Sequence, residues 1–244
     1  MAEQIWIARL LNSFLAAPAD AILRALGVHV AHPASPISNT FAMEILVAGV
    51  LGLGATLMAR RLSVDRPGMW QHALEVSWNG IGDHGDEVIG HGGGHRFLPY
   101  LFTLFFFILI CNLIGMIPGF ESPTADITVT VGLALITFFY YHAVGIHRHG
   151  VFGYLKTFAG PILGLAWLMF PLEIFSHFAR VLSLSVRLYA NMYAGELITT
   201  IFLALVPVSG FLFLGLHTFI ALLQAYIFLV LAMVYLSGAL AEEH

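Results

Sequence analysis

Arg187 is the residue with the clearest chemistry in this sequence. It lies in the apolar run Ser183-Leu-Ser-Val-Arg187-Leu-Tyr-Ala-Asn191. A guanidinium keeps its proton in proteins, and placing it at the bilayer centre costs roughly 2.5–3.5 kcal/mol on the insertion scale. A charge fixed at that depth predicts a functional site and needs a partner. We expect the partner to be a carboxylate on another subunit.

The neighbours of Arg187 continue its polar face along a helix. Glu173, Arg180 and Arg187 are spaced seven apart and therefore share one face, and Asn191 follows four residues on. A polar stripe on an apolar helix is typical of a helix that faces another protein or water. Ala190 and Ala194 are small residues at a spacing that allows close helix–helix approach.

Three further polar residues have the chemistry of a proton path. Glu196 lies nine residues beyond Arg187, roughly 180° around the helix, so it faces away from the arginine. A carboxyl group in an apolar setting can exchange protons. His217 and Gln224 share a face of the next helix, where imidazole can relay a proton and the amide can order water or bond Arg187. Helix packing is the alternative role for His217, Gln224 and Asn191.

The composition predicts an all-α integral membrane protein. The chain has 244 residues, of which 59% are hydrophobic and 10% charged, and its mean hydropathy is +0.88. Soluble domains are about one quarter charged. A net charge of −4 gives no sign of nucleic-acid binding, and the single cysteine, Cys111, excludes an intrachain disulfide. No motif indicates a metal, a cofactor or catalysis within the chain itself.

Two regions are expected along the chain. Residues 1–38 are predicted to be an amphipathic segment lying on the membrane surface or docked on the protein. Residues 39–244 are predicted to be one polytopic membrane domain with spans at about 41–59, 97–117, 127–146, 168–205 and 210–240. Breaks are expected at Pro118, Pro161 and Pro171. The last two helices would be about 50 and 46 Å long, so they should form a steeply tilted hairpin with its tip at Pro207–Gly210.

The connecting segments indicate an orientation. Basic residues gather after the first and third spans, whereas the loop 118–126 has none, which places the N-terminus outside and the C-terminus inside. The basic residues counted are Arg60, Arg61, Arg66, Arg96, Arg148 and Lys156. The glycine- and histidine-rich stretch Gly80–His95 is predicted to be a mobile, solvated loop, because triglycine between His91 and His95 would break the helix that a metal site of this spacing needs.

The central motif, extended through Tyr193-Ala-Gly-Glu196, closely resembles the signature of subunit a of the F-type ATP synthase, in its bacterial form. The resemblance continues in the run from His217 through Gln224 to Tyr235. It also includes Cys111-Asn112 to Pro118 and Thr124-Ala-Asp126. The similarity covers most of the chain after about residue 41.

The resemblance implies a stator subunit beside a rotating ring of c subunits, in the bacterial inner membrane. Arg187 matches the family's essential arginine, and Glu196, His217, Gln224 and Asn191 match polar positions of its aqueous paths. Asp126 and Asn112 resemble entry-side polar positions. The expected partners are the c-subunit ring, the peripheral-stalk b subunits, the rest of the ATP synthase complex and membrane lipid, with Arg180, Ala190 and Ala194 on the face toward the ring.

Together, the residues and the resemblance predict two offset half-channels separated by Arg187, which couple ion flow to ring rotation. The carried ion is expected to be the proton, although the choice between proton and sodium is only partly decided by this chain because the carboxylate of the ring is on another chain. The alternative is a self-contained proton-coupled secondary transporter, which often has two similar halves; no convincing repeat relates the segments 41–146 and 158–240. An intramembrane hydrolase would need motifs such as Gly-x-Ser-x-Gly, which are absent from the sequence.

Overall fold

The computed structural model describes residues 4–25, 27, 35–63, 67–90, 92–117, 119–158 and 166–241. Over these ranges the chain is helical, as the composition predicts. Seven α-helices and one short 3₁₀ helix follow one another: α1 Trp6–Ala25, α2 Asn39–Ala59, α3 Met69–Ile89, α4 Gly93–Ile114, η1 Pro123–Ala125, α5 Ile127–Thr157, α6 Ala166–Leu205 and α7 Pro207–Leu240. Arg66, His91, Pro118, Pro161 and the C-terminal Glu242-Glu243-His244 lie outside the described residues.

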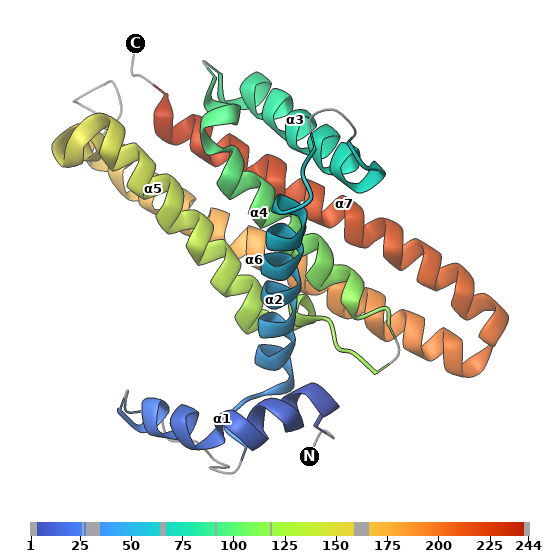
Figure 1. The fold of residues 1–244 in the computed structure, drawn as a ribbon. Coiled ribbons are helices and arrows are strands. Elements are labelled where there is room, and N and C mark those ends of the chain that lie inside the picture. Colours follow the sequence, from blue (N-terminus) through green and yellow to red (C-terminus); the bar gives the residue numbers. More distant parts are fainter. Residues whose placement is uncertain are drawn as a thin grey trace.

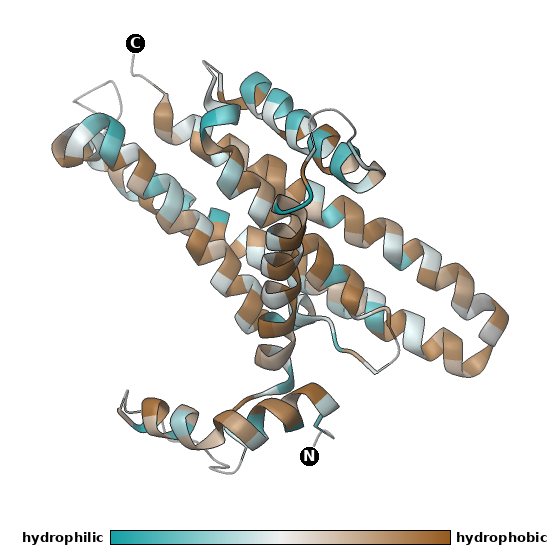
Figure 2. Ribbon diagram, viewed as in Figure 1, coloured by the Kyte–Doolittle hydropathy of each residue, from teal (hydrophilic) through white to brown (hydrophobic). Residues whose placement is uncertain are grey.

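Five of these helices are long and apolar enough to cross a membrane, namely α2, α4, α5, α6 and α7. Helices α4 to α7 form a bundle (Figure 1), and most of the ribbon of these helices has the colours of hydrophobic residues (Figure 2). The core of the bundle contains fully buried residues of three helices, among them Leu101, Leu188 and Phe228. The all-α membrane fold is therefore confirmed, although the spans differ in their ends from the sequence prediction.

Helix α1 lies crosswise to the start of α2, on the side of the molecule away from α3 and the C-terminus (Figure 1). The side-chain amide of Asn12 holds it there, because its oxygen accepts from Ile37 N–H at 3.0 Å and its nitrogen donates to Ile37 C=O at 3.0 Å. Trp6, Phe14 and Ile22 are 61%, 77% and 61% exposed. These exposed apolar side chains suit a membrane-surface position, which stays a prediction.

The last two helices form a hairpin with a tighter tip than predicted. Only Val206 separates α6 from α7, and α7 begins at Pro207 rather than near Gly210. Proline suits the first helical position, where its missing N–H has no helical partner to lose. Gly210 allows the close approach at this tip, because a Cβ there would lie 2.7 Å from Leu203 Cα.

The predicted break at Pro171 is wrong, because α6 runs through it from Ala166. Pro171 lies in the second turn, so its missing N–H removes one hydrogen bond close to the helix start.

Helix α5 also continues past the expected end at His147-Arg148-His149, as far as Thr157. The interruption comes instead at Gly150, whose φ of 72° and ψ of 163° kink the helix; glycine adopts this conformation without a Cβ clash.

The prediction of a mobile loop at Gly80–His95 is also wrong. Residues up to Ile89 belong to α3, and α4 already begins at Gly93. Some of the glycines are packing sites: a Cβ on Gly94 would collide with the backbone of Asp86 and Gly82. Composition suggested flexibility, but glycine also allows two helices to approach closely.

Asp86 joins the two arms of this helical hairpin. Its Oδ1 accepts hydrogen bonds from the backbone N–H groups of Gly94 at 2.7 Å and His95 at 3.3 Å, and Oδ2 lies 2.6 Å from His95 Nδ1. The side-chain hydrogen bond from His95 lowers the pKa of Asp86. The carboxylate thus occupies the first turn of α4, where orphan N–H groups favour a negative charge.

We predict that Gly94→Ala lowers the thermal unfolding temperature of the purified protein in detergent, because the new methyl group pushes α3 off α4. Overpacking of this kind costs about 1–3 kcal/mol. Gly80→Ala is the matched control, since a Cβ on Gly80 meets nothing within 4 Å and alanine gains up to about 1 kcal/mol in an exposed helix. Equal unfolding temperatures for the two variants would contradict close α3–α4 packing.

Candidate functional site

Arg187 lies on the exposed face of α6, within the longest helix of the protein. Among the described residues, no carboxylate oxygen lies within 4.0 Å of its guanidinium. Asn191, Ala190 and Ala194 are exposed beside it on the following turns. The bundle therefore presents a permanent positive charge on a surface that carries small side chains and lacks an internal counter-ion in the described chain.

One turn from Arg187, a polar contact ties the hairpin together. Asn191 Nδ2 donates to Gln224 Oε1 at 2.7 Å, and Gln224 is almost completely buried. The second amide atom, Gln224 Nε2, is buried without a hydrogen-bond partner in the described protein. Buried polar atoms are almost always paired, so this nitrogen is available to a ligand, a water molecule or a moving side chain near Arg187.

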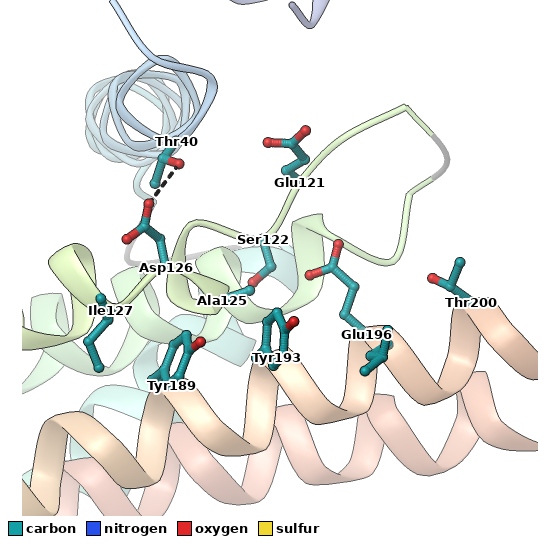
Figure 3. A pocket seen from close by; sticks show the side chains of 11 residues that line it. Thr40, Glu121, Ser122, Ala125, Asp126, Ile127, Tyr189, Tyr193, Glu196 and Thr200 are labelled. Carbon is teal, nitrogen blue, oxygen red and sulfur yellow. Dashed lines mark hydrogen bonds between the residues drawn. The ribbon is translucent and has the colours of Figure 1, made fainter. Parts of the chain in front are cut away.

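A cavity of about 540 Å³ opens on the other side of α6. Its walls come from the start of α2, from η1 and the segment before it, from the start of α5 and from α6. Three carboxylates line it, on Glu121, Asp126 and Glu196. Figure 3 shows the Glu196 side chain rising from α6 toward the segment that carries Glu121 and Ser122. We call this space the outer cavity.

The two sequence-predicted carboxylates of the outer cavity differ in their surroundings. Asp126 caps α5: its Oδ1 accepts from Thr128 N at 2.9 Å and Thr128 Oγ1 at 2.8 Å, and its Oδ2 accepts from Thr40 Oγ1 at 3.2 Å. Burial by itself raises the pKa of Asp126, but these hydrogen bonds outweigh it and the pKa is lowered. Asp126 therefore holds a negative charge, whereas Glu196 has no hydrogen-bond partner among the described residues.

His217 lies on α7 against the other side of the Glu196 turn. A Cβ on Gly195 would lie 2.8 Å from His217 Cδ2 and 2.9 Å from Nε2, so the imidazole fits only because residue 195 is glycine. His217 is 5% exposed, and its Nε2 has no hydrogen-bond partner in the described protein. Glu196 and His217 thus flank adjacent faces of α6 and are not joined by a direct hydrogen bond.

Asn112 does not line the outer cavity, and both polar atoms of its side chain are hydrogen-bonded. Its Nδ2 donates to Ala221 C=O at 3.0 Å, and its Oδ1 accepts from Thr124 Oγ1 at 2.7 Å. Ser122 continues this network with bonds to Cys111 C=O at 2.9 Å and to Thr124 at 2.9 Å. Asn112 is fully buried and joins α4, η1 and α7, and its network reaches the lining of the outer cavity through Ser122.

A second polar cluster lies toward the other end of α6. His177 links two helices, because its Nδ1 lies 2.8 Å from Tyr141 OH and its Nε2 lies 3.3 Å from Glu173 Oε1. Arg180 Nη2 is 3.9 Å from the same carboxylate oxygen, and its Cζ lies 5.4 Å from the centroid of the Tyr235 ring. We call these residues the inner cluster. Sequence analysis missed His177, although its spacing of four from Glu173 was a usable signal.

Comparison with known proteins identifies the family of this chain. The family model described as "ATP synthase A chain" matches residues 40–237, which is most of the chain. The chain belongs to the ATP synthase A chain family. Proteins named ATP synthase subunit a from Koribacter versatilis and Solibacter usitatus are 49% and 45% identical to it. The first alignment covers 100% of both chains, and the second covers 96% of this chain and 99% of the relative.

A more distant relative, ATP synthase subunit a of Sulfurimonas denitrificans, is 42% identical over 82% of this chain and 90% of its own length. Membership of the ATP synthase A chain family places the protein in ATP synthesis and ion transport, as a multi-pass membrane subunit of a larger complex. The resemblance drawn from the central motif is therefore confirmed at the level of the family.

Proposed function

We propose that this chain is the stator subunit that conducts protons past a rotating ring of c subunits, and that it contributes to coupling rather than to catalysis. The observation that carries the proposal is Arg187 itself: an exposed charge on a membrane helix, without an internal counter-ion among the described residues. A ring carboxylate supplied by another chain meets that need, since an intramembrane charge is expensive without a partner.

In this mechanism the outer cavity is the entry path. Protons gather among the carboxylates of Glu121 and Asp126 and reach Glu196, which protrudes into the same space. His217 lies across Gly195 with a buried, unpaired ring nitrogen. Because imidazole can accept a proton on one nitrogen and release it from the other, His217 can exchange protons with Glu196 through water.

The proton then neutralises a carboxylate of the ring. A neutral carboxylic acid can enter lipid, whereas the ionised form is held out by its desolvation cost. Ala190 and Ala194 are exposed and small, which allows a ring helix to come close to α6. The neutral site moves away into the membrane as the ring turns, and the next site takes its place beside Arg187.

The inner cluster serves as the exit side. Glu173, His177 and Tyr141 form a continuous chain of titratable groups from α6 to α5, and Arg180 borders it. Arg187 lies between this cluster and the outer cavity along α6. Its charge favours the ionised ring carboxylate and repels a proton that would cross directly, while about 2.3 kcal/mol per charge per 100 mV drives net transfer.

The proposed setting follows from the same residues. The chain lies in the inner membrane of a bacterium with its N-terminus outside and its C-terminus in the cytoplasm, as the basic residues near α2, α4 and α5 indicate. Its partners are the c-subunit ring, the peripheral-stalk b subunits and the remaining ATP synthase subunits. Asn191 and Gln224 position the Arg187 face through their hydrogen bond.

Arg187→Ala tests this function most simply. We expect it to abolish proton-driven ATP synthesis in vesicles that contain the assembled complex, because the attraction for the ring carboxylate and the barrier to leakage are lost together. Arg187→Lys should rescue poorly, since lysine lacks the planar fork and can lose its proton when buried. Arg24→Ala, on a 63% exposed side chain of α1, is the control. Near-normal synthesis by Arg187→Ala would refute the proposal.

We also predict that Glu196 and His217 act in one path. Glu196→Gln and His217→Ala should each slow proton flux through the assembled complex, measured by quenching of a pH-sensitive dye in vesicles. Because both residues serve the same transfer, the double variant should lose less than the sum of the two single losses in log rate. Strictly additive losses would indicate independent roles for the two side chains.

A further inference from the structure

A second cavity, of about 430 Å³, is lined by none of the described residues of the outer cavity or the inner cluster and lies where α4 begins, α5 approaches its kink and α7 ends. Its described lining residues are Arg96, Phe97, Tyr140, Ala143, Val144, His147, Arg148 and Leu240. We call it the basic cavity. Two arginines and a histidine stand against an otherwise apolar and aromatic wall, and none of the described lining residues is acidic.

The aromatic wall of the basic cavity is held rigidly. The rings of Tyr140 and Tyr100 stack with centroids 3.8 Å apart, and Phe97 meets Tyr140 edge-on at 6.3 Å. Tyr100 OH donates to Thr137 Oγ1 at 3.0 Å, and this hydrogen bond anchors the stacked rings to α5. Arg96 Cζ lies 5.6 Å from the Phe97 ring centroid. The aromatic wall therefore positions the Arg96 guanidinium but supplies no negative charge to neutralise it.

The cavity continues into an apolar stripe on α5. Ile136, Tyr140, Ala143 and His147 recur at spacings of three and four, so they share one helix face. Ile136 is 57% exposed at the apolar end of the stripe, and His147 is exposed at the basic end. The face thus changes from apolar at Ile136 to polar at His147 within about three turns.

We propose that the basic cavity binds an anionic phospholipid, with its phosphate between Arg96 and Arg148 and an acyl chain along Ile136. Arginine forks match the oxygens of a phosphate and bind it bidentately. Basic pockets between membrane helices on the cytoplasmic side suit anionic headgroups, and the basic-residue pattern puts this end of the bundle on that side. A free phosphate would use the arginines but gain nothing from the apolar stripe.

The bound lipid would brace three helices at one point. Arg96 belongs to α4, Arg148 and Tyr140 to α5, and Leu240 to α7. Gly150 kinks α5 two residues after Arg148, so this end of α5 lacks the continuous hydrogen bonding that stabilises its middle. A ligand that contacts both sides of the cavity would hold the α5 end against the other two helices. The proposal is independent of the transport role of Arg187.

The test uses the purified, assembled complex, stripped of lipid by detergent and returned to nanodiscs of phosphatidylcholine with or without phosphatidylglycerol. Native mass spectrometry counts the phosphatidylglycerol retained on this chain. Replacing Arg96→Gln and Arg148→Gln together should weaken retention, by roughly fivefold for each arginine removed near the surface. Arg60→Gln with Arg61→Gln is the matched control, because these two exposed arginines lie outside the cavity.

Three outcomes would overturn the proposal. Equal retention by the wild type, the cavity variant and the control would show that the cavity does not select the lipid. Displacement of the lipid by inorganic phosphate alone would indicate a free-anion site. Glu242 and Glu243 follow Leu240 in the sequence, so a severalfold gain in retention after both are changed to glutamine would mean that the chain's own carboxylates fill the cavity.

A second readout separates binding from misfolding. If the paired glutamine variant assembles poorly, Arg96→Lys with Arg148→Lys keeps both charges and removes only the forks. Phosphatidylglycerol should raise the unfolding temperature of the wild type and of the Arg60/Arg61 control, raise that of the lysine variant less, and leave that of the glutamine variant unchanged. An equal rise in all of them would contradict a specific site.

Discussion

The charge of Arg187 constrains the rest of the protein. An arginine in a membrane helix keeps its proton, so its cost can be lowered only by a carboxylate, by water or by other polar groups. The described chain provides no carboxylate within 4.0 Å. It places one polar cavity on the opposite side of α6 and a polar cluster further along the same helix. This separation suits a carboxylate on another subunit that gains a proton beside one of these sites and loses it beside the other.

The outer cavity and the inner cluster lie at separate places along α6, which is one arm of the α6–α7 hairpin. The two arms of this hairpin can pack closely because a few residues between them are small. Gly195 admits the His217 ring, and Gly210 admits Leu203 at the tip. Asn191 and Gln224 add a polar bond within an apolar interface. Such a bond contributes only about 0.6 kcal/mol on average inside a membrane, so its value lies mainly in fixing the register of α6 against α7 one turn from Arg187.

Much of this could be predicted from the sequence, because apolar length and helical periodicity determine it. Apolar length predicts the five spans and the long hairpin. Helical spacing predicts that Arg187 and Glu196 point in opposite directions. The helical fold of Gly80–His95 did not follow, since glycine-rich composition is shared by mobile loops and closely packed helices, and only the contact of Gly94 with α3 distinguishes them. The link from Tyr141 to His177 joins residues 36 positions apart, a distance that local patterns do not resolve. The kink at Gly150 was also missed, because a basic His147-Arg148-His149 run looks like the end of a span.

Disulfide crosslinking to the ring tests the central claim most directly. Asn191 and Tyr193 lie at nearly the same depth on α6 but point about 160° apart, and Tyr193 lines the outer cavity. In complexes whose ring carries a cysteine beside its carboxylate, Asn191→Cys should form the disulfide readily under mild oxidation, whereas Tyr193→Cys should form little. Equal crosslinking from both positions, or none from Asn191→Cys, would show that the Arg187 face does not meet the ring carboxylate.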